Sequence, residues 1–166
     1  DQLTSGTTWH AAGLIGQLGA SATITKLRNY SLNLYKQLEN ETGLSTGLKQ
    51  NGSLTVATTN ERLEELKRQV TTAQLFNVEA NEVTKEQIKD IYPLINTQDV
   101  IGGVHIPKDG QADPIGVTNV LAKAAKISGA DIIEHCLVNK IIVKNNKIEG
   151  VETDQGKIDC EYVVLA

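Results

Sequence analysis

Residues 3–16 read LTSGTTWHAAGLIG and place the single Trp of the chain, Trp9, next to one of its three His residues, His10. Small residues surround this pair, and Gly6 and Gly13 allow the backbone to approach a ligand closely. The hydroxyls and backbone N–H groups of residues 4–8 are typical of an anion cradle that leads into a helix N-terminus. The stretch lacks the GxGxxG and Gly-Lys-Ser/Thr patterns of nucleotide loops. Residue types therefore leave two interpretations open, a ligand loop or a capped helix start with Trp9 packed in the core.

Hydrophobic periodicity and turn residues predict the elements that follow this stretch. Helices are expected at 27–42, 59–76, 85–93 and 113–129, the first ended by Gly43 and the last opened by Asp113 and Pro114. Asn51-Gly52 signals a tight turn, and strands are expected around Leu54 and Val56 (53–58) and at 78–84, 99–107, 131–135, 136–145, 147–154 and 156–166. A bulge or a close backbone approach is expected at Gly102 and Gly103. This order predicts a mixed α+β or α/β fold in which one layer is inserted in another.

The composition is that of an ordinary globular domain. The chain has 166 residues, of which 40% are hydrophobic and 22% charged, and its net charge is −4. This balance argues against nucleic acid as a partner, because such binding needs a basic face. No apolar run reaches the length of a membrane span, and no secretory signal pattern is present. Cys136 and Cys160 fit a reducing compartment and have no metal-site spacing, so neither secretion nor a metal site is expected.

Two features lead us to expect an internal piece of a longer protein. The sequence contains no Met, and residues 161–166, EYVVLA, read as an apolar strand that continues to the last position.

Several other residues carry chemistry-bearing side chains. His105, in GGVHIP, either faces a substrate or is an ordinary packed or surface histidine. His135 and Cys136 adjoin each other in an expected extended segment, which places their side chains on opposite faces and excludes a dyad. Asp109 and Asp113 resemble an acid pair, but a turn with the following glycine and a helix start explain them better.

Five stretches together resemble a known family. They are LTSGTTWHAAGLIGQL (3–18), YSLNLYKQLENETG (30–43), NGSLTVATTNERLEELKR (51–68), YPLINTQDVIGGVHIPKDGQADP (92–114) and VETDQGKIDCEYVVLA (151–166). The chain is similar along its length to the dimethylglycine dehydrogenase and sarcosine dehydrogenase family, FAD-dependent amine oxidoreductases of the D-amino-acid-oxidase fold group.

The resemblance implies a two-domain fold, with a Rossmann-like FAD domain and an inserted mixed-sheet substrate domain. The N-terminal GxGxxG unit of that family is expected upstream of this chain. Residues 1–51 and 109–166 then belong to the FAD domain, and residues 52–108 belong to the substrate domain.

The resemblance also implies a flavin site. In the family, the His of this motif carries FAD through a bond from its imidazole to the flavin 8α-methyl carbon, and that residue is His10 here. The residues implied to line FAD are Gly6, Thr7, Thr8, Trp9, Ala11, Ala12, Gly13 and Leu14. Val138 matches the position whose backbone meets the adenine. Gly19 stands where many relatives have Arg, which removes any charge contact made from that position.

The implied activity is oxidation of an N-methylated glycine, dimethylglycine or sarcosine, by hydride transfer to the flavin. In many members a further domain, outside this chain, binds tetrahydrofolate. No catalytic residue is assigned within the chain, and the piece alone is expected to be inactive. The alternatives are a non-catalytic relative resembling the pyruvate dehydrogenase phosphatase regulatory subunit and an oxygen-using amine oxidase. The implied location is the bacterial cytoplasm or the mitochondrial matrix, and the electron acceptor stays open.

Overall fold

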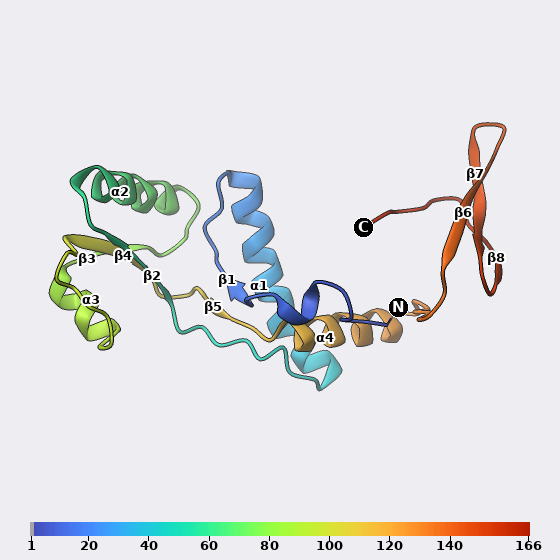
Figure 1. The fold of residues 1–166 in the computed structure, drawn as a ribbon, viewed down its shortest axis with the longest axis horizontal. Coiled ribbons are helices and arrows are strands. Elements are labelled where there is room, and N and C mark those ends of the chain that lie inside the picture. Colours follow the sequence, from blue (N-terminus) through green and yellow to red (C-terminus); the bar gives the residue numbers. More distant parts are fainter. Residues whose placement is uncertain (1) are drawn as a thin grey trace.

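The computed structural model describes residues 2–166. They form three parts that lie one after another along the long axis of the molecule (Figure 1). The elements are η1 (Thr8–His10), β1 (Leu14–Ile15), α1 (Ala22–Thr42), β2 (Ser53–Ala57), α2 (Asn60–Leu75), β3 (Asn81–Val83), α3 (Lys85–Ile91), β4 (Gly102–Ile106), β5 (Gly110–Gln111), α4 (Pro114–Ile127), β6 (Val138–Lys144), β7 (Lys147–Thr153) and β8 (Gly156–Asp159). Helices α1 and α4 occupy the middle with η1, β1 and β5. Strands β2–β4 with α2 and α3 form a lobe at one end, and β6–β8 form a meander at the other (Figure 1). The mixed α/β class is as expected.

The two central helices begin and end at the residues that the sequence indicates. Helix α1 packs against α4 and ends at Gly43, whose φ of 67° is left-handed. Glycine tolerates this conformation without a steric penalty. Helix α4 begins at Asp113, whose carboxylate accepts hydrogen bonds from the N–H groups of Ile115 and Gly116, and Pro114 occupies its first turn. These caps are confirmed, because each satisfies backbone groups that a helix end leaves free.

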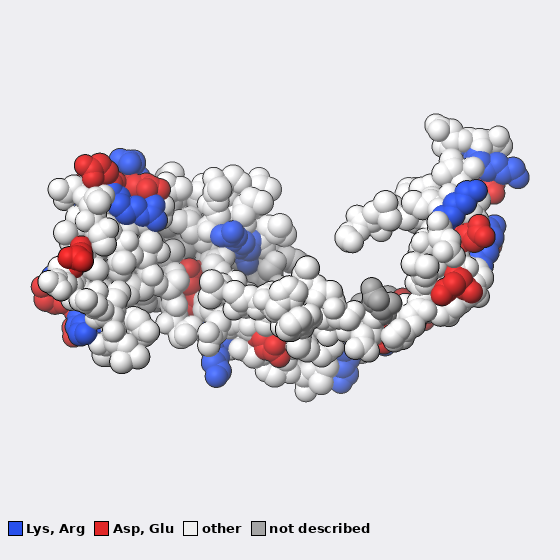
Figure 2. Space-filling view, viewed as in Figure 1, with Lys and Arg blue, Asp and Glu red and all other residues white. Residues whose placement is uncertain are grey.

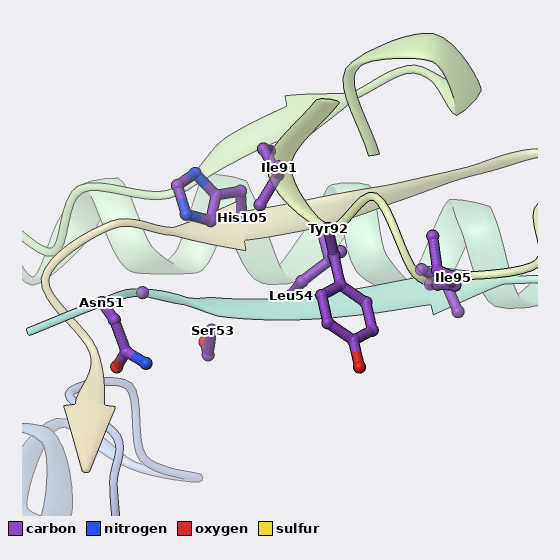
Figure 3. A pocket seen from close by; sticks show the side chains of 9 residues that line it. Asn51, Ser53, Leu54, Ile91, Tyr92, Ile95 and His105 are labelled. Carbon is purple, nitrogen blue, oxygen red and sulfur yellow. The ribbon is translucent and has the colours of Figure 1, made fainter. Parts of the chain in front are cut away.

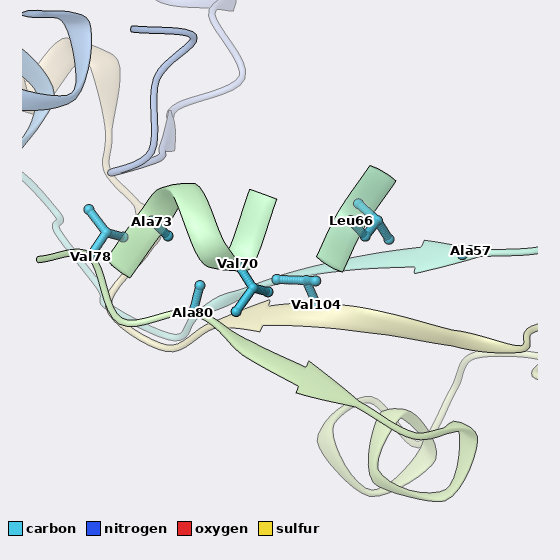
Figure 4. Packing of buried hydrophobic residues seen from close by; sticks show 7 residues of the cluster. All are labelled: Ala57, Leu66, Val70, Ala73, Val78, Ala80 and Val104. Carbon is cyan, nitrogen blue, oxygen red and sulfur yellow. The ribbon is translucent and has the colours of Figure 1, made fainter. Parts of the chain in front are cut away.

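The lobe is built on the antiparallel sheet β2-β4-β3, and α2 covers one face of it. Its buried cluster comprises Ala57, Leu66, Val70, Ala73, Val78, Ala80 and Val104 (Figure 4). A fully buried leucine such as Leu66 contributes about 2–5 kcal/mol relative to alanine. Helix α3 contributes the fully buried Ile88 beside Gly103. A Cβ at Gly103 would lie 2.4 Å from the Thr55 carbonyl oxygen, which confirms the close backbone approach; the ladder shows no bulge there.

Two antiparallel segments connect the lobe to the middle part. Lys49 and Gln111 exchange backbone hydrogen bonds of 2.8 and 3.0 Å, and the N–H of Gly52 donates to the Asp109 carbonyl at 2.9 Å. The second segment, which includes β5, also pairs with β1, so three chain segments lie side by side at this junction. Gly52, at φ 80°, lies in the antiparallel pairing of residues 49–52 with residues 109–111. It does not form the tight turn that Asn51-Gly52 suggests.

The meander β6-β7-β8 confirms both predicted hairpins. Asn145 and Asn146 turn the first hairpin with φ values of 50° and 60°, the conformation that a two-residue turn matching the strand twist requires. On the face shown in Figure 2, positive and negative side chains are interspersed over the meander and over α2 rather than gathered by sign. Pairs such as Lys157 with Asp159 and Arg62 with Glu65 are both exposed.

One predicted strand, at 131–135, does not form, and another, at 156–166, forms only over Gly156–Asp159. Residues 131–137 contain no strand, and residues 160–166 run on without a paired strand. His135 has a φ of 55°, so the argument that an extended backbone separates its side chain from that of Cys136 is wrong. Apolar character alone does not make a strand, because a strand also needs a neighbour for its backbone hydrogen bonds.

Three apolar residues that recur at helical spacing in the sequence are exposed. Leu66 and Val70 of α2 are buried, but Leu75 is 75% exposed because the helix ends there and Phe76 packs against the cluster instead. Leu27 and Tyr30 lie mostly exposed on α1, on a face that nothing among residues 2–166 covers.

Glu39, near the end of α1, holds the segment that follows this helix through hydrogen bonds. Its Oε1 accepts hydrogen bonds from the Thr46 hydroxyl at 2.6 Å, from the Thr46 N–H, and from the Ser45 hydroxyl at 3.2 Å. The Thr46 bonds, with a smaller contribution from Ser45, lower the pKa of Glu39 below its usual value against the opposing effect of partial burial. The fully buried Thr46 in turn accepts at its carbonyl from the Asp113 N–H, which ties α1 to the start of α4.

The Glu39→Gln variant is expected to be about 1 kcal/mol less stable at neutral pH, because a partly screened site loses part of a charge-assisted network. A lowered folded-state pKa stabilises the protein above the unfolded-state value and loses its effect as the pH falls through the folded value. The difference from wild type should therefore shrink below pH 4.5. Denaturant unfolding between neutral and acid pH measures it, with Glu41→Gln as the control on the same helix. A difference independent of pH would contradict the expectation.

Candidate cofactor groove

The opening stretch lies along α4. The Leu3 N–H donates to Glu134 Oε1 at 2.6 Å, just beyond the C-terminal end of α4. The chain then passes η1, which packs against α4, and reaches the start of α4, where the Ala112 N–H donates to the Gly13 carbonyl at 2.8 Å. Residues 3–13 thus run alongside α4, which is about 100 positions later in the sequence (Figure 1).

Two interpretations of this stretch are wrong in detail. Trp9 is 63% exposed, so it is not packed in the core. The loop at residues 4–8 leads into the three-residue η1 and not into an α-helix, since α1 begins only at Ala22. A cradle at an α-helix N-terminus is therefore not formed there, because a single 3-10 turn aligns few peptide dipoles.

The same stretch forms one wall of a groove of about 590 Å³. The residues of the stretch that line it are Thr7, Thr8, Ala11, Ala12, Gly13, Leu14 and Ile15. The opposite wall comes from Tyr35 of α1 and from Val117 and Thr118 of α4, none of which sequence reasoning had singled out. Their positions follow from the packing of α1 on α4, and no local motif marks them.

Gly13 sets the shape of the groove where it reaches α4. Its φ is 69°, and a Cβ there would lie 2.2 Å from the Ala112 carbonyl oxygen. Any other residue would be strained in backbone and would collide with the neighbouring chain. Gly6 differs, since a Cβ at that position would meet nothing within 4 Å.

His10 lies exposed between two lining residues, Thr8 and Ala11. Its ring meets that of Trp9 edge-on, with the centroids 4.7 Å apart and the planes at 60°. Among residues 2–166 the imidazole has no hydrogen-bond partner, so a nitrogen is free to react or to bind a ligand. Val138 is half exposed at the start of β6 and does not line the groove.

His105 lies in a separate hollow of about 520 Å³ on the lobe (Figure 3). It stands directly opposite Leu54 in the β2–β4 ladder, on the sheet face away from the α2 cluster, and Ile91 and Tyr92 close the other side. No Lys, Arg, Asp or Glu is among the residues that line this hollow. A zwitterionic amino acid would find no ionic partner there, which favours the interpretation of His105 as an ordinary partly buried residue.

Asp109 was predicted to form a turn with Gly110, but the turn lies earlier, over residues 106–109, and Asp109 is its last residue. The turn closes between Ile106 and Asp109, Gly110 already belongs to β5, and the carboxylate is buried between distant segments. No sequence signal indicated this, since Asp-Gly is common in turns.

The profile of the family described as FAD dependent oxidoreductase matches residues 1–166. The chain belongs to this family. The resemblance to sarcosine and dimethylglycine dehydrogenases is confirmed. Mitochondrial sarcosine dehydrogenase of Homo sapiens is 40% identical over 170 residues, covering 99% of this chain and 18% of the relative. The mitochondrial pyruvate dehydrogenase phosphatase regulatory subunit of Mus musculus is 34% identical over 163 residues, 98% of this chain and 19% of that protein. The chain thus spans about a fifth of the length of such relatives.

The fold is shared with a solved dehydrogenase structure. The crystal structure of L-proline dehydrogenase from P. horikoshii superposes with a TM-score of 0.88 at 32% identity, over 95% of this chain and 41% of that one. The mixed α/β fold expected for a part of an FAD-dependent oxidoreductase family member is therefore supported by structure as well as by sequence.

The groove fits the cofactor that the FAD-dependent oxidoreductase family uses. Its lining combines the small residues Ala11, Ala12 and Gly13 with apolar atoms of α4 and with hydroxyl-bearing residues, Thr7, Thr8 and Thr118, of which the Thr118 hydroxyl donates to the Pro114 carbonyl at 2.9 Å. A flat aromatic ring system with a polar tail requires this combination. Among residues 2–166 no group of three or more His, Cys, Asp or Glu is placed to hold a metal ion. In the same described part, every helix is too short or too polar to cross a membrane.

Proposed function

We propose that the full-length protein is an FAD-dependent dehydrogenase that oxidises an N-methylated glycine, with the flavin covalently attached to His10. One observation carries this proposal. The stretch that carries the resemblance to the amine dehydrogenases lines one side of the groove, and His10 stands exposed within it. Sarcosine and dimethylglycine are the proposed substrates because relatives named for their oxidation match over 99% of the chain.

Each groove residue has a proposed task. A neutral imidazole nitrogen is a competent nucleophile near neutral pH, and His10 supplies it for the bond to the flavin 8α-methyl carbon. Ala11 and Ala12 keep the approach to that nitrogen open, while Thr7 and Thr8 donate hydrogen bonds along the cofactor. Trp9 holds the imidazole edge-on. When bound, FAD supplies the hydride-accepting chemistry.

The remaining assignments follow from the family. Residues 1–51 and 109–166 are proposed as FAD domain and residues 52–108 as substrate domain. Val138 is proposed to meet the adenine, and the alignment of Leu3 with Glu134 beyond α4 supports this, since it brings the start of the chain near the segment that leads to β6. Tetrahydrofolate would bind outside this chain. A bacterial cytoplasm or a mitochondrial matrix is the proposed location.

The rival proposal is a non-catalytic protein like the phosphatase regulatory subunit, which matches at 34% identity. Overall identity does not separate the two, but His10 does, because a binding protein has no need of a nucleophilic imidazole at the flavin edge. An amine oxidase would differ only in passing the electrons to oxygen.

Anaerobic addition of sarcosine or dimethylglycine to the purified full-length protein tests the proposal. The flavin absorbance is expected to bleach with one or both amines, and flavin should remain on the polypeptide after acid denaturation. A colourless protein would move the assignment to the regulatory relative. Bleaching followed by rapid recolouring in air would indicate an oxidase. Quantitative release of flavin by acid would contradict attachment at His10.

A further inference from the structure

Asp109 is the buried acidic residue that the proposed chemistry leaves unused. It is 5% exposed, and both of its carboxylate oxygens are engaged. Oδ1 accepts from the Gln17 N–H at 2.7 Å, and Oδ2 accepts from the Ser53 hydroxyl at 2.6 Å. Among residues 2–166 no Lys, Arg or His forms an ion pair with it, so these neutral donors are what compensate its burial.

The two donors belong to different parts of the molecule. Gln17 follows β1, two positions beyond Ile15 at the end of the groove, and its side chain also donates to Asn29 of α1 at 2.6 Å. Ser53 is the first residue of β2 and so begins the lobe. The Asp109 carbonyl accepts from the Gly52 N–H at 2.9 Å. One residue therefore joins the groove segment, α1 and the lobe sheet.

The geometry also explains why an acidic side chain suits this position. The backbone N–H of Gln17 can only donate, so it needs an acceptor, whereas the Ser53 hydroxyl can donate or accept. A carboxylate satisfies both from one position. An asparagine could do the same, with its oxygen towards Gln17 and its NH₂ towards Ser53, but an alanine would leave the Gln17 N–H buried without a partner.

We propose that Asp109 is a positioning residue that sets the lobe against the cofactor groove. This inference rests on the proposed function, because its purpose is to hold the substrate-binding lobe in register with the flavin. It acts through Gln17 and Ser53 and touches neither substrate nor cofactor. Small displacements of a substrate from the reacting atom lower rates steeply, so loss of this link should affect turnover more than cofactor content.

The test uses the full-length protein and the variants Asp109→Ala, Asp109→Asn and Ser53→Ala, with Asp90→Ala of the exposed lobe surface as the control. Asp109→Ala is expected to lower kcat/KM about 10- to 100-fold while covalent flavin is retained. Asp109→Asn should restore kcat/KM to within about threefold, because it can keep both hydrogen bonds. Ser53→Ala, which removes only one donor, should fall between them.

Hydrogen exchange supplies a readout that does not depend on the flavin. Asp109→Ala should speed amide exchange in both 14–20 and 52–57, while the 138–159 meander and the Asp90→Ala protein stay unchanged. Faster exchange confined to 107–111, or no rescue by asparagine, would overturn the proposal. If Asp109→Ala does not fold, Ser53→Ala decides it, and unchanged exchange and kinetics there would overturn it too. A protein without flavin would refute the proposed function, yet the exchange comparison would still test the link.

Discussion

Replacing His10 by Ala in the full-length protein is expected to abolish acid-stable flavin. The neighbouring positions of the stretch carry Ala, Gly and Thr, which are weaker nucleophiles than an imidazole, so we expect none of them to take over the bond. Flavin fluorescence that stays with the denatured polypeptide should fall from stoichiometric to less than about one-tenth. Flavin that can be washed out should still bind, because the wall made by the rest of the stretch is intact.

The matched control for this variant is His135→Ala. His135 is exposed before β6 and is not among the residues of the groove, so its loss should leave acid-stable flavin at the wild-type level. If the His10→Ala protein kept acid-stable flavin, attachment at His10 would be wrong and another residue would have to carry the bond. Loss of flavin in both variants would point to a general folding defect.

Gly13→Ala is expected to damage the groove itself. A left-handed backbone costs a non-glycine residue about 1–2 kcal/mol, and the new Cβ would also meet the Ala112 oxygen at 2.2 Å. The chain must move to relieve that contact, which breaks the 2.8 Å hydrogen bond between the Ala112 N–H and the Gly13 carbonyl. We expect the free energy of unfolding to fall by about 2 kcal/mol or more, with much reduced flavin incorporation.

Gly6→Ala is the control from the same stretch. No atom lies within 4 Å of a Cβ at Gly6, and its backbone is not left-handed, so stability should be unchanged. Thermal unfolding and the ratio of flavin to protein measure both variants. Equal behaviour of the two glycine variants would show that the approach of residue 13 to residue 112 does not shape the groove.

Local sequence predicted the elements whose signals are self-contained. The caps at Gly43 and Asp113 form because the capping groups lie within a few residues of the groups they satisfy. The hairpin at Asn145 and Asn146 forms for the same reason. The expected strand at 131–135 and the second part of the one expected at 156–166 did not form, because a strand depends on a distant partner that periodicity cannot supply.

The candidate site divides in the same way. The motif around His10 identified the wall of the groove, but Tyr35 and Thr118 enter only through the packing of α1 on α4. The exposure of Trp9 could not be predicted from the sequence either, because a lone aromatic residue among small residues suits a core as well as a ligand site.

The sequence by itself determined the family, the mixed fold class, the helix caps and the motif that carries the candidate site, because each resides in a short continuous run of residues. Only the tertiary structure decided that this motif lies along α4 to form a groove, and that Asp109 joins Gln17 to Ser53 across 92 and 56 positions of chain. The carboxylate of Asp109 meets these donors only because distant chain segments lie side by side in the fold. The spacing of residues along the sequence does not indicate which segments do so.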